Sequence, residues 1–240
     1  MAIRDLTTAR QRTLYASMFA FTLMSATSAS AQTKSFDARY EVRAHGLRIG
    51  EMRRKLEIKR DRYRFDSHIE SSGLAALLNG GRIDESSEGT IVAGSFQPLL
   101  YSHRRTGRKQ RETQIIFDWN RGAIKSINGD QELQIKATHG TLDKLVYQMA
   151  LSVDVANSVT YLHYLVADGG RLKSYRWQRL PGETVEIRDT PISTIKVAYD
   201  PPGSGRKTVL WLAPSYHYLP VKIEYTDDGK VTTAVLLELH

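Results

Sequence analysis

Hydrophobic and polar residues alternate along much of the chain. Between residues 36 and 43 every odd-numbered position is charged, and the apolar even-numbered positions are Phe36, Ala38, Tyr40 and Val42. The same period of two recurs, less regularly, in residues 52–58 and 63–69, and again in residues 221–226. Such alternation is typical of antiparallel strands that have one face on a core and the other in water.

Short turn signals separate these segments. Glycine supplies a positive φ, and Asn or Asp tolerates one, as tight hairpin turns require. The turn signals are Asn79-Gly80-Gly81, Thr106-Gly107, Arg121-Gly122, Asn128-Gly129, Asp168-Gly169-Gly170, Pro181-Gly182, Pro201-Pro202-Gly203 and Asp228-Gly229. Many short strands joined by turns predict a large curved sheet, a barrel or a sandwich.

One segment has helical spacing instead. Starting at Leu142, the apolar positions lie three and four residues apart at Leu145, Val146, Met149, Ala150 and Val153. This spacing predicts an amphipathic helix, which must bury its apolar stripe on another element. We expect Thr141 to cap the start, Asp143 to lie in the first turn, and the helix to end within residues 154–158.

A second apolar run, residues 74–78, lies between Gly73 and Gly80. It is too short to be a stable helix by itself, so we expect an apolar loop or a single helical turn. The fold class that these patterns predict is mainly all-β: a curved antiparallel sheet or half-open β-barrel with one amphipathic helix and one short apolar helical turn. No linker or repeat divides residues 32–240, which we therefore interpret as a single domain.

The first thirty-one residues have the three parts of a secretory signal. Arg4, Arg10 and Arg12 form a basic start, residues 14–26 are uncharged and mostly apolar, and Ala29-Ser30-Ala31 has the small-x-small pattern of a cleavage site. The apolar run is shorter than the ~20 residues that a membrane span needs. We predict cleavage after Ala31 and a secreted protein.

Composition narrows the function further. The chain has no cysteine, which excludes disulfides, a thiol nucleophile, cysteine-ligated metal and a lipid-modified cysteine. The net charge is +8, and two of these charges fall in the predicted signal. This mild basic bias suits solubility as well as contact with anionic envelope surfaces, and the secreted address disfavours nucleic acid as a partner.

No motif for catalysis stands out. The seven histidines lack the spacing of zinc sites, and nucleophile elbows, phosphate loops and dinucleotide fingerprints are missing. We interpret His163 and His217 as ordinary strand histidines, and we place the acidic cluster of Asp84, Glu85 and Glu88 on a solvated strand and turn. The sequence thus predicts a protein that is not an enzyme and that holds no cofactor or metal. It also predicts a monomer.

Basic residues concentrate at one predicted hairpin tip. These candidates for contact with an anionic surface are Arg104, Arg105, Arg108, Lys109 and Arg111. Such a tip can dock to phosphates by charge-assisted hydrogen bonds. A solvated hairpin that its charge protects from edge pairing accounts for the same residues.

Several short stretches, taken in order, resemble a known family. They are residues 40–50 (YEVRAHGLRIG), 97–101 (QPLLY), 116–119 (IFDW), 142–151, 168–175 and 211–213 (WLA) followed by 219–221 (LPV). In this order they resemble the exported bacterial proteins collected as domain of unknown function 3108. The resemblance covers nearly all of the chain after the signal. It implies a protein of the Gram-negative periplasm with a mainly antiparallel β fold, and it carries over no catalytic residue, cofactor or activity.

A more distant analogy, at the level of fold, is to the periplasmic lipoprotein carriers, whose half-open β-barrels hold acyl chains under a helical lid. An incompletely closed sheet can enclose an apolar cavity. The residues that we expect to line or cover it are Leu74, Leu77, Leu78, Leu145, Met149, Trp177 and Trp211. A plain hydrophobic core would use the same residues.

Three functions follow from these patterns. The first is a non-enzymatic protein that binds a lipid-like or other apolar ligand in envelope maintenance. The second is an interaction scaffold that docks an envelope protein or an anionic glycan through its basic tips. The third is a hydrolase of envelope polymers, which requires two acids, or one acid and His163 or His217, to converge in one cleft.

Overall fold

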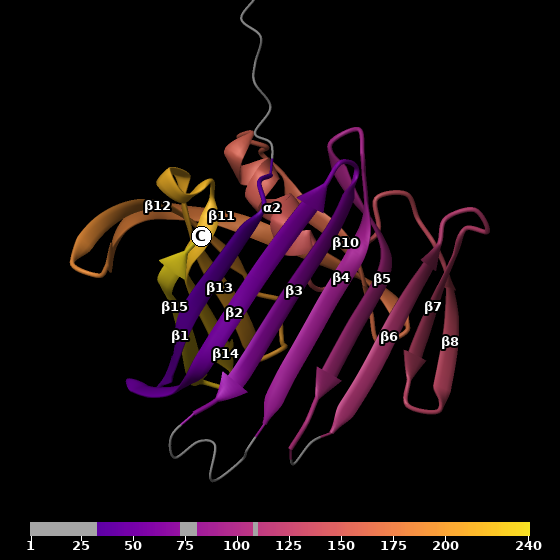
Figure 1. Ribbon diagram of the computed structural model, residues 1–240, viewed down its shortest axis with the longest axis horizontal. Coiled ribbons are helices and arrows are strands. Elements are labelled where there is room, and N and C mark those ends of the chain that lie inside the picture. Colours follow the sequence, from indigo (N-terminus) through magenta and orange to yellow (C-terminus); the bar gives the residue numbers. More distant parts are fainter. Residues whose placement is uncertain (1–32, 73–80, 108–109) are drawn as a thin grey trace, which may run out of the picture. The chain divides into compact units, whose positions relative to one another are not determined.

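The computed structural model describes residues 33–72, 81–107 and 110–240, and these fold around one antiparallel sheet of fifteen strands (Figure 1). The strands are β1 (Phe36–Ala44), β2 (Leu47–Lys59), β3 (Arg62–Ser71), β4 (Arg82–Val92), β5 (Ser95–Arg105), β6 (Arg111–Asp118), β7 (Ala123–Asn128), β8 (Gln131–Lys136), β9 (Leu142–Asp143), β10 (Leu162–Asp168), β11 (Arg171–Ile187), β12 (Thr190–Tyr199), β13 (Arg206–Ala213), β14 (Leu219–Asp227) and β15 (Lys230–Leu239). The predicted mainly β fold is confirmed.

The first and last strands pair at the middle of the sheet. From β1 the strands run outward in sequence order to β8, and from β15 they run outward in reverse order to β9. Each neighbouring pair is antiparallel except β9 with β10. The two outer strands, β8 and β9, do not pair with each other, so the sheet stays open.

Tight turns make this meander, and four of the hairpins have two-residue turns in which both residues have positive φ and at least one is not glycine. They are His45–Gly46, Ala93–Gly94, Arg188–Asp189 and Asp228–Gly229. Paired positive φ values match the twist of the flanking strands. One predicted turn is wrong: Pro181–Gly182 lies within β11 at a register shift opposite β12. Proline is tolerated there because a bulge leaves its position without a ladder hydrogen bond.

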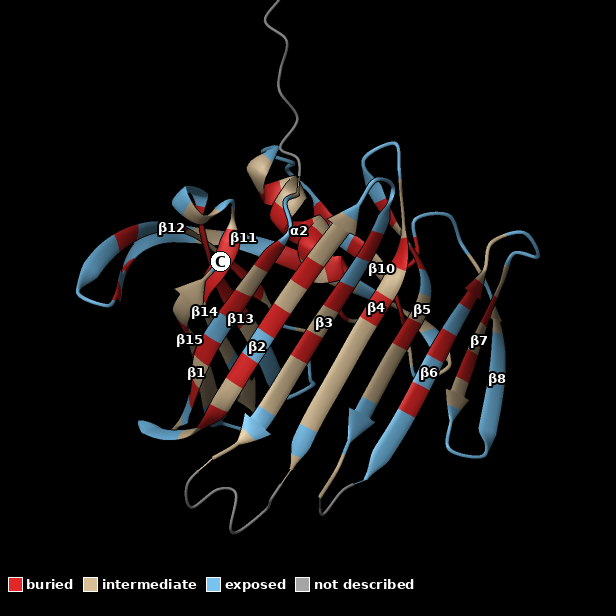
Figure 2. Ribbon diagram, viewed as in Figure 1, coloured by how far each residue is buried: buried red, intermediate tan, exposed pale blue. Residues whose placement is uncertain are grey.

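The alternation along the strands sorts side chains as expected. In β1 the residues Phe36, Ala38, Tyr40 and Val42 are buried, and Figure 2 shows buried bands crossing the strands of this part of the sheet. The sheet curves, and its two halves face each other across the helix α2 (Tyr147–Ala156) (Figure 1). None of the ten residues of α2 is exposed, because the curved sheet surrounds it.

The start of α2 differs from the prediction. Leu142 and Asp143 form β9, which pairs in parallel with Val166 and Ala167, and the helix begins only at Tyr147. Thr141 does not cap it, since its hydroxyl donates to the carbonyl of Thr138 at 2.6 Å.

Asp143 is the reason for the later start. Its Oδ1 accepts the backbone N–H groups of Leu145 (2.8 Å) and Val146 (2.9 Å), a local side-chain turn that competes with helix. The carboxyl thus ends a strand and turns the chain into the helix.

Polar contacts anchor α2 to both halves of the sheet. Before the helix, Ser87 Oγ of β4 donates to Asp143 Oδ2 at 2.5 Å. Within it, the buried Arg54 of β2 donates to Gln148 Oε1 at 2.7 Å. After it, Arg179 of β11 donates to the carbonyl of Val159 at 3.1 Å. The helix is therefore fixed along its length.

Asp143 is fully buried, and this desolvation raises the pKa of its carboxyl to about 6, although the hydrogen bonds from Ser87, Val146 and Leu145 act to lower it. Burial outweighs the donors because the charged form loses its water.

The alternation predicts which leucine of β2 contributes to the stability of the fold. Leu56→Ala removes a fully buried side chain and should lower the free energy of unfolding by about 2–5 kcal/mol. Leu47→Ala, in the same strand at a position 71% exposed, should change it by less than about 0.5 kcal/mol. Urea unfolding of both variants measures the difference, and equal losses would contradict this assignment of the two faces.

Asp143 should make stability depend on pH. Because its pKa is about 6 in the folded protein against 3.8 for an ordinary Asp, protonation favours the folded state, and this contribution is lost as the pH rises from 4 to 7. Asp143→Asn retains an acceptor for the two backbone amides and does not titrate. Its free energy of unfolding should rise relative to the wild type by about 2 kcal/mol over that range. Urea unfolding at pH 4, 5.5 and 7 tests this, and a constant difference would refute it.

Candidate functional site

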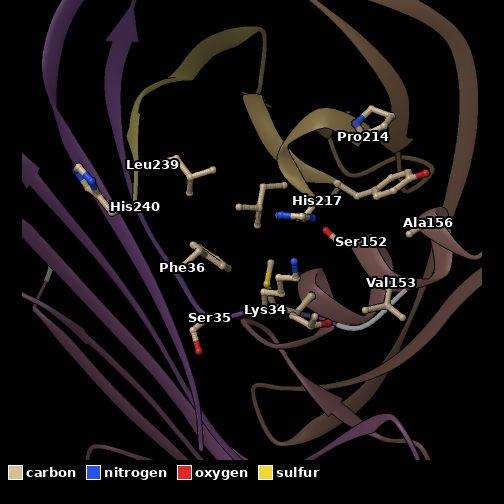
Figure 3. Close-up of a pocket in the computed structure, with 14 residues that line it drawn as sticks. Lys34, Ser35, Phe36, Ser152, Val153, Ala156, Pro214, His217, Leu239 and His240 are labelled. Atoms are coloured by element: carbon tan, nitrogen blue, oxygen red, sulfur yellow. The ribbon is translucent and has the colours of Figure 1, made fainter. Parts of the chain in front are cut away.

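A cavity of about 480 Å³ opens at the end of the strands where β1 begins and β15 ends (Figure 3). Four segments of the chain surround it: the residues leading into β1, α2, the end of β15, and the short 3-10 helix η1 (Pro214–Tyr216) with the residues after it. The lining residues are Thr33, Lys34, Ser35, Phe36, Met149, Ser152, Val153, Ala156, Pro214, His217, Tyr218, Leu219, Leu239 and His240. We call this the terminal cavity.

The walls of the terminal cavity are mostly apolar. Phe36 comes from β1, Met149 and Val153 from α2, Leu219 from β14 and Leu239 from β15. Met149 is 1% exposed and Phe36 8%, so the walls are fixed by the core behind them. Small-molecule sites occupy about 300–1,000 Å³ and are mainly apolar with a few placed polar groups, and the terminal cavity has this character.

The polar lining residues are serines, threonine, lysine and histidines. Ser152 already donates to the carbonyl of Gln148 at 3.1 Å within the helix, and His240 Nε2 lies 3.7 Å from Glu238 Oε2. Lys34 and His217 make no ion pair with any residue in the described ranges. No aspartate or glutamate side chain lines the cavity among those residues.

The backbone is unusual at one edge of the terminal cavity. His217 and Tyr218 follow η1 with φ values of 54° and 59°, a conformation that residues other than glycine seldom adopt. The amide of Tyr218 bonds the carbonyl of Ala213 at 2.9 Å, and the amide of His217 bonds that of Pro214 at 3.2 Å. This tight loop places His217 and Tyr218 in the wall at some cost in backbone strain, a feature often found at ligand sites.

The predicted lining residues are divided between the cavity and the core. Met149 lines the terminal cavity. Leu145 (1% exposed) lies in the packed core. Trp177 packs in an aromatic cluster, with its ring centroid 5.8 Å from that of Tyr199. These two therefore serve the core instead of the cavity wall, and Leu74, Leu77 and Leu78 lie outside the described residues.

Trp211 is also away from the terminal cavity. It is 3% exposed, and the ammonium groups of Lys196 and Lys222 lie 4.7 and 4.2 Å from its ring centroid. The two lysines are its register neighbours on β12 and β14. Cation–π contact with flanking strands explains its burial, so this tryptophan stabilises the sheet.

The sequence did not predict most of the residues that line the terminal cavity. Phe36 is part of the alternating run, but the period of two shows only that it points inward. Pro214, Tyr218, Leu219 and Leu239 carry no signal that separates a cavity wall from a core. Their common feature is that they lie at one end of the strands, which becomes visible only in the folded chain.

A second, much smaller cavity of about 30 Å³ lies near the open side of the sheet. Its lining residues are Tyr101, His103, Arg111, Thr113, Ile115, Lys144, Asp168 and Gly169. Burial lowers the pKa of His103. Burial acts to raise the pKa of Asp168, but Lys144 (3.4 Å) and Lys173 hold it below its ordinary value. The space is about that of one water molecule.

The predicted basic tip lies at the β5–β6 connection. Arg104, Arg105 and Arg111 are exposed, and Arg105 lies directly opposite Arg111 in the register. None of the three has an ion pair within the described part of the chain, whereas many other surface arginines do, such as Arg53 with Asp37. Arg108 and Lys109 lie outside the described residues.

The structure also places the groups considered for hydrolysis. Asp84 and Glu88 point outward to Arg82 and Arg64, while Glu85 accepts from Tyr101 at 2.5 Å. His163 lies on the exposed side of β10, with Nε2 2.6 Å from Ser174 Oγ.

His217 is in the terminal cavity, away from any lining carboxylate of the described residues. Within those residues no cluster of three metal-ligating side chains forms. A hydrolase therefore stays a prediction.

No helix in the described ranges has the length and apolar character needed to cross a membrane. The predicted signal, residues 1–31, lies outside those ranges.

Comparison with known proteins gives a fold relative and a family. A crystal structure of a β-barrel-like protein of domain of unknown function DUF1849 from Brucella abortus is similar, with a TM-score of 0.57 and 9% identity over 87% of this chain and 98% of that one. At this identity the likeness concerns the fold alone. No curated protein matches the chain. The family described as protein of unknown function (DUF3108) matches residues 36–235, and the chain therefore belongs to this family.

Proposed function

We propose that this protein is a non-enzymatic binding protein that holds a lipid-like ligand in the terminal cavity and serves maintenance of the cell envelope. The observation that carries the proposal is the mostly apolar 480 Å³ space between α2 and the ends of β1 and β15. An apolar space of this size is stabilised by an apolar occupant, because each buried methylene contributes about 0.8 kcal/mol.

Two further features support the proposal. The walls are preformed, since α2 is anchored by Asp143, Arg54 and Arg179, so binding does not have to order them. The signal predicted from residues 1–31 would deliver the protein to the periplasm, where lipids move between two membranes. A monomer suffices, because the cavity is built from one chain.

Filling the cavity should weaken ligand binding. Val153→Trp places a large side chain in the space from the partly buried face of α2. We expect the wild type to bind lauric acid, and Val153→Trp to bind it at least tenfold more weakly, because the acyl chain and the indole compete for one volume. Isothermal titration below the micellar concentration measures the affinity.

Val231→Trp is the matched control, since Val231 is 39% exposed at the start of β15, at the opposite end of the strands from the cavity. It should bind lauric acid like the wild type. Circular dichroism and urea unfolding verify that both variants fold. If the wild type fails to bind, or if folded Val153→Trp binds normally, the terminal cavity is not the site.

A second candidate function is docking to an anionic surface through the β5–β6 tip. The observation that favours it is that Arg105 and Arg111 lie directly opposite each other on β5 and β6, and neither has an ion pair among the described residues. Like charges directly opposite each other destabilise a strand pair, and an anion between them removes that cost.

Charge removal at the tip should weaken surface binding. The double variant Arg104→Gln/Arg105→Gln should bind phosphatidylglycerol-containing vesicles roughly 30-fold more weakly, at about 1 kcal/mol for each basic residue. The wild-type affinity should fall steeply with salt. Co-sedimentation tests this against Arg60→Gln/Arg62→Gln, which removes the same charge from another exposed turn. Equal effects of the two double variants would refute a specific docking tip.

A further inference from the structure

The terminal cavity has a charge bias in its polar lining. Its ionisable side chains among the described residues are Lys34, His217 and His240, all of types that carry positive or no charge. Figure 3 shows Lys34, Ser152 and His217 directed into the same space. An apolar ligand without a head group would leave this polar side unused.

Two of these basic side chains have no neighbouring carboxylate among the described residues to neutralise them. His240 has a carboxylate partner, because its Nε2 lies 3.7 Å from Glu238 Oε2. Lys34 and His217 have no carboxylate partner in the described ranges, although ion pairs cover much of the outer face of β1, β2 and β3. Two unpaired basic groups facing an apolar cavity are complementary to an anion attached to an apolar chain.

The backbone conformation of His217 is energetically unfavourable. His217 and Tyr218 occupy left-handed backbone conformations in the hairpin connection between β13 and β14, where their amides bond the carbonyls of Pro214 and Ala213. The imidazole borders the cavity, although His217 is itself exposed to solvent. Strain that persists at the wall of a cavity indicates a role for the residue that it positions.

The volume limits the apolar part of the ligand. Sites for small molecules occupy about 300–1,000 Å³, and the 480 Å³ of the terminal cavity lies in this range. The space therefore accommodates one acyl chain.

We infer that the terminal cavity binds a single-chain anionic amphiphile, with the acyl chain against Phe36, Met149 and Leu239 and the carboxylate or phosphate head between Lys34 and His217. This inference rests on the proposed function, since it names the ligand class of the same cavity. A free fatty acid and a lysophospholipid present the same chemistry there.

The experiment compares lauric acid with its neutral analogue monolaurin at pH 7.5, by isothermal titration. The wild type should bind laurate at least tenfold more tightly than monolaurin. In Lys34→Gln/His217→Gln this preference should fall to less than threefold, while the affinity for monolaurin stays unchanged. Lysophosphatidic acid, measured in parallel, shows whether a phosphate head is preferred to a carboxylate.

The matched control is Lys230→Gln/His163→Gln, which removes one exposed lysine and one exposed histidine outside the cavity. It should keep the wild-type preference. If the wild type binds laurate and monolaurin equally, or if Lys34→Gln/His217→Gln keeps the preference, the anionic head is wrong while the apolar site stands. If neither ligand binds, the proposed function itself fails.

Discussion

The rest of the structure depends on how the concave face of an open sheet is filled. A barrel that closes can fill its interior with inward side chains, but here β8 and β9 stay apart. The inner surface needs another element to exclude water, and α2 supplies it. That none of the ten helix residues is exposed, and that polar contacts anchor the helix segment to β2, β4 and β11, follow from this position.

The terminal cavity lies along one side of the helix. Its lining residues from α2 are Met149, Ser152, Val153 and Ala156, which lie three and four positions apart and therefore share one face of the helix. This face borders the space where β1 begins and β15 ends, while Leu145 before the helix packs in the core.

Many charged side chains on the outer face of the sheet form ion pairs. On the outer face, opposite charges are neighbours along and across strands, as in Arg64 with Asp66 and Arg206 with Asp227. Exposed pairs of this kind add little stability, but they keep the outer surface soluble and mixed in sign. Basic side chains without an ion pair among the described residues include Lys34 in the wall of the terminal cavity and Arg105 at the β5–β6 tip, as well as Arg60 on another exposed turn. Lys34 differs from Arg60 in that it borders an apolar cavity.

Local patterns in the sequence determined much of the architecture. The alternation in β1 and the glycine turns require only neighbouring residues, so the antiparallel strands and the family resemblance could be predicted. The start of α2 could not, because Leu142 and Asp143 form a strand that pairs with Val166 and Ala167, which lie much later in the chain. Likewise, Met149 lines a cavity and Leu145 fills the core, although both are apolar residues of one periodic segment. The tertiary structure decided between them, because a side chain borders a cavity only when no other element reaches it.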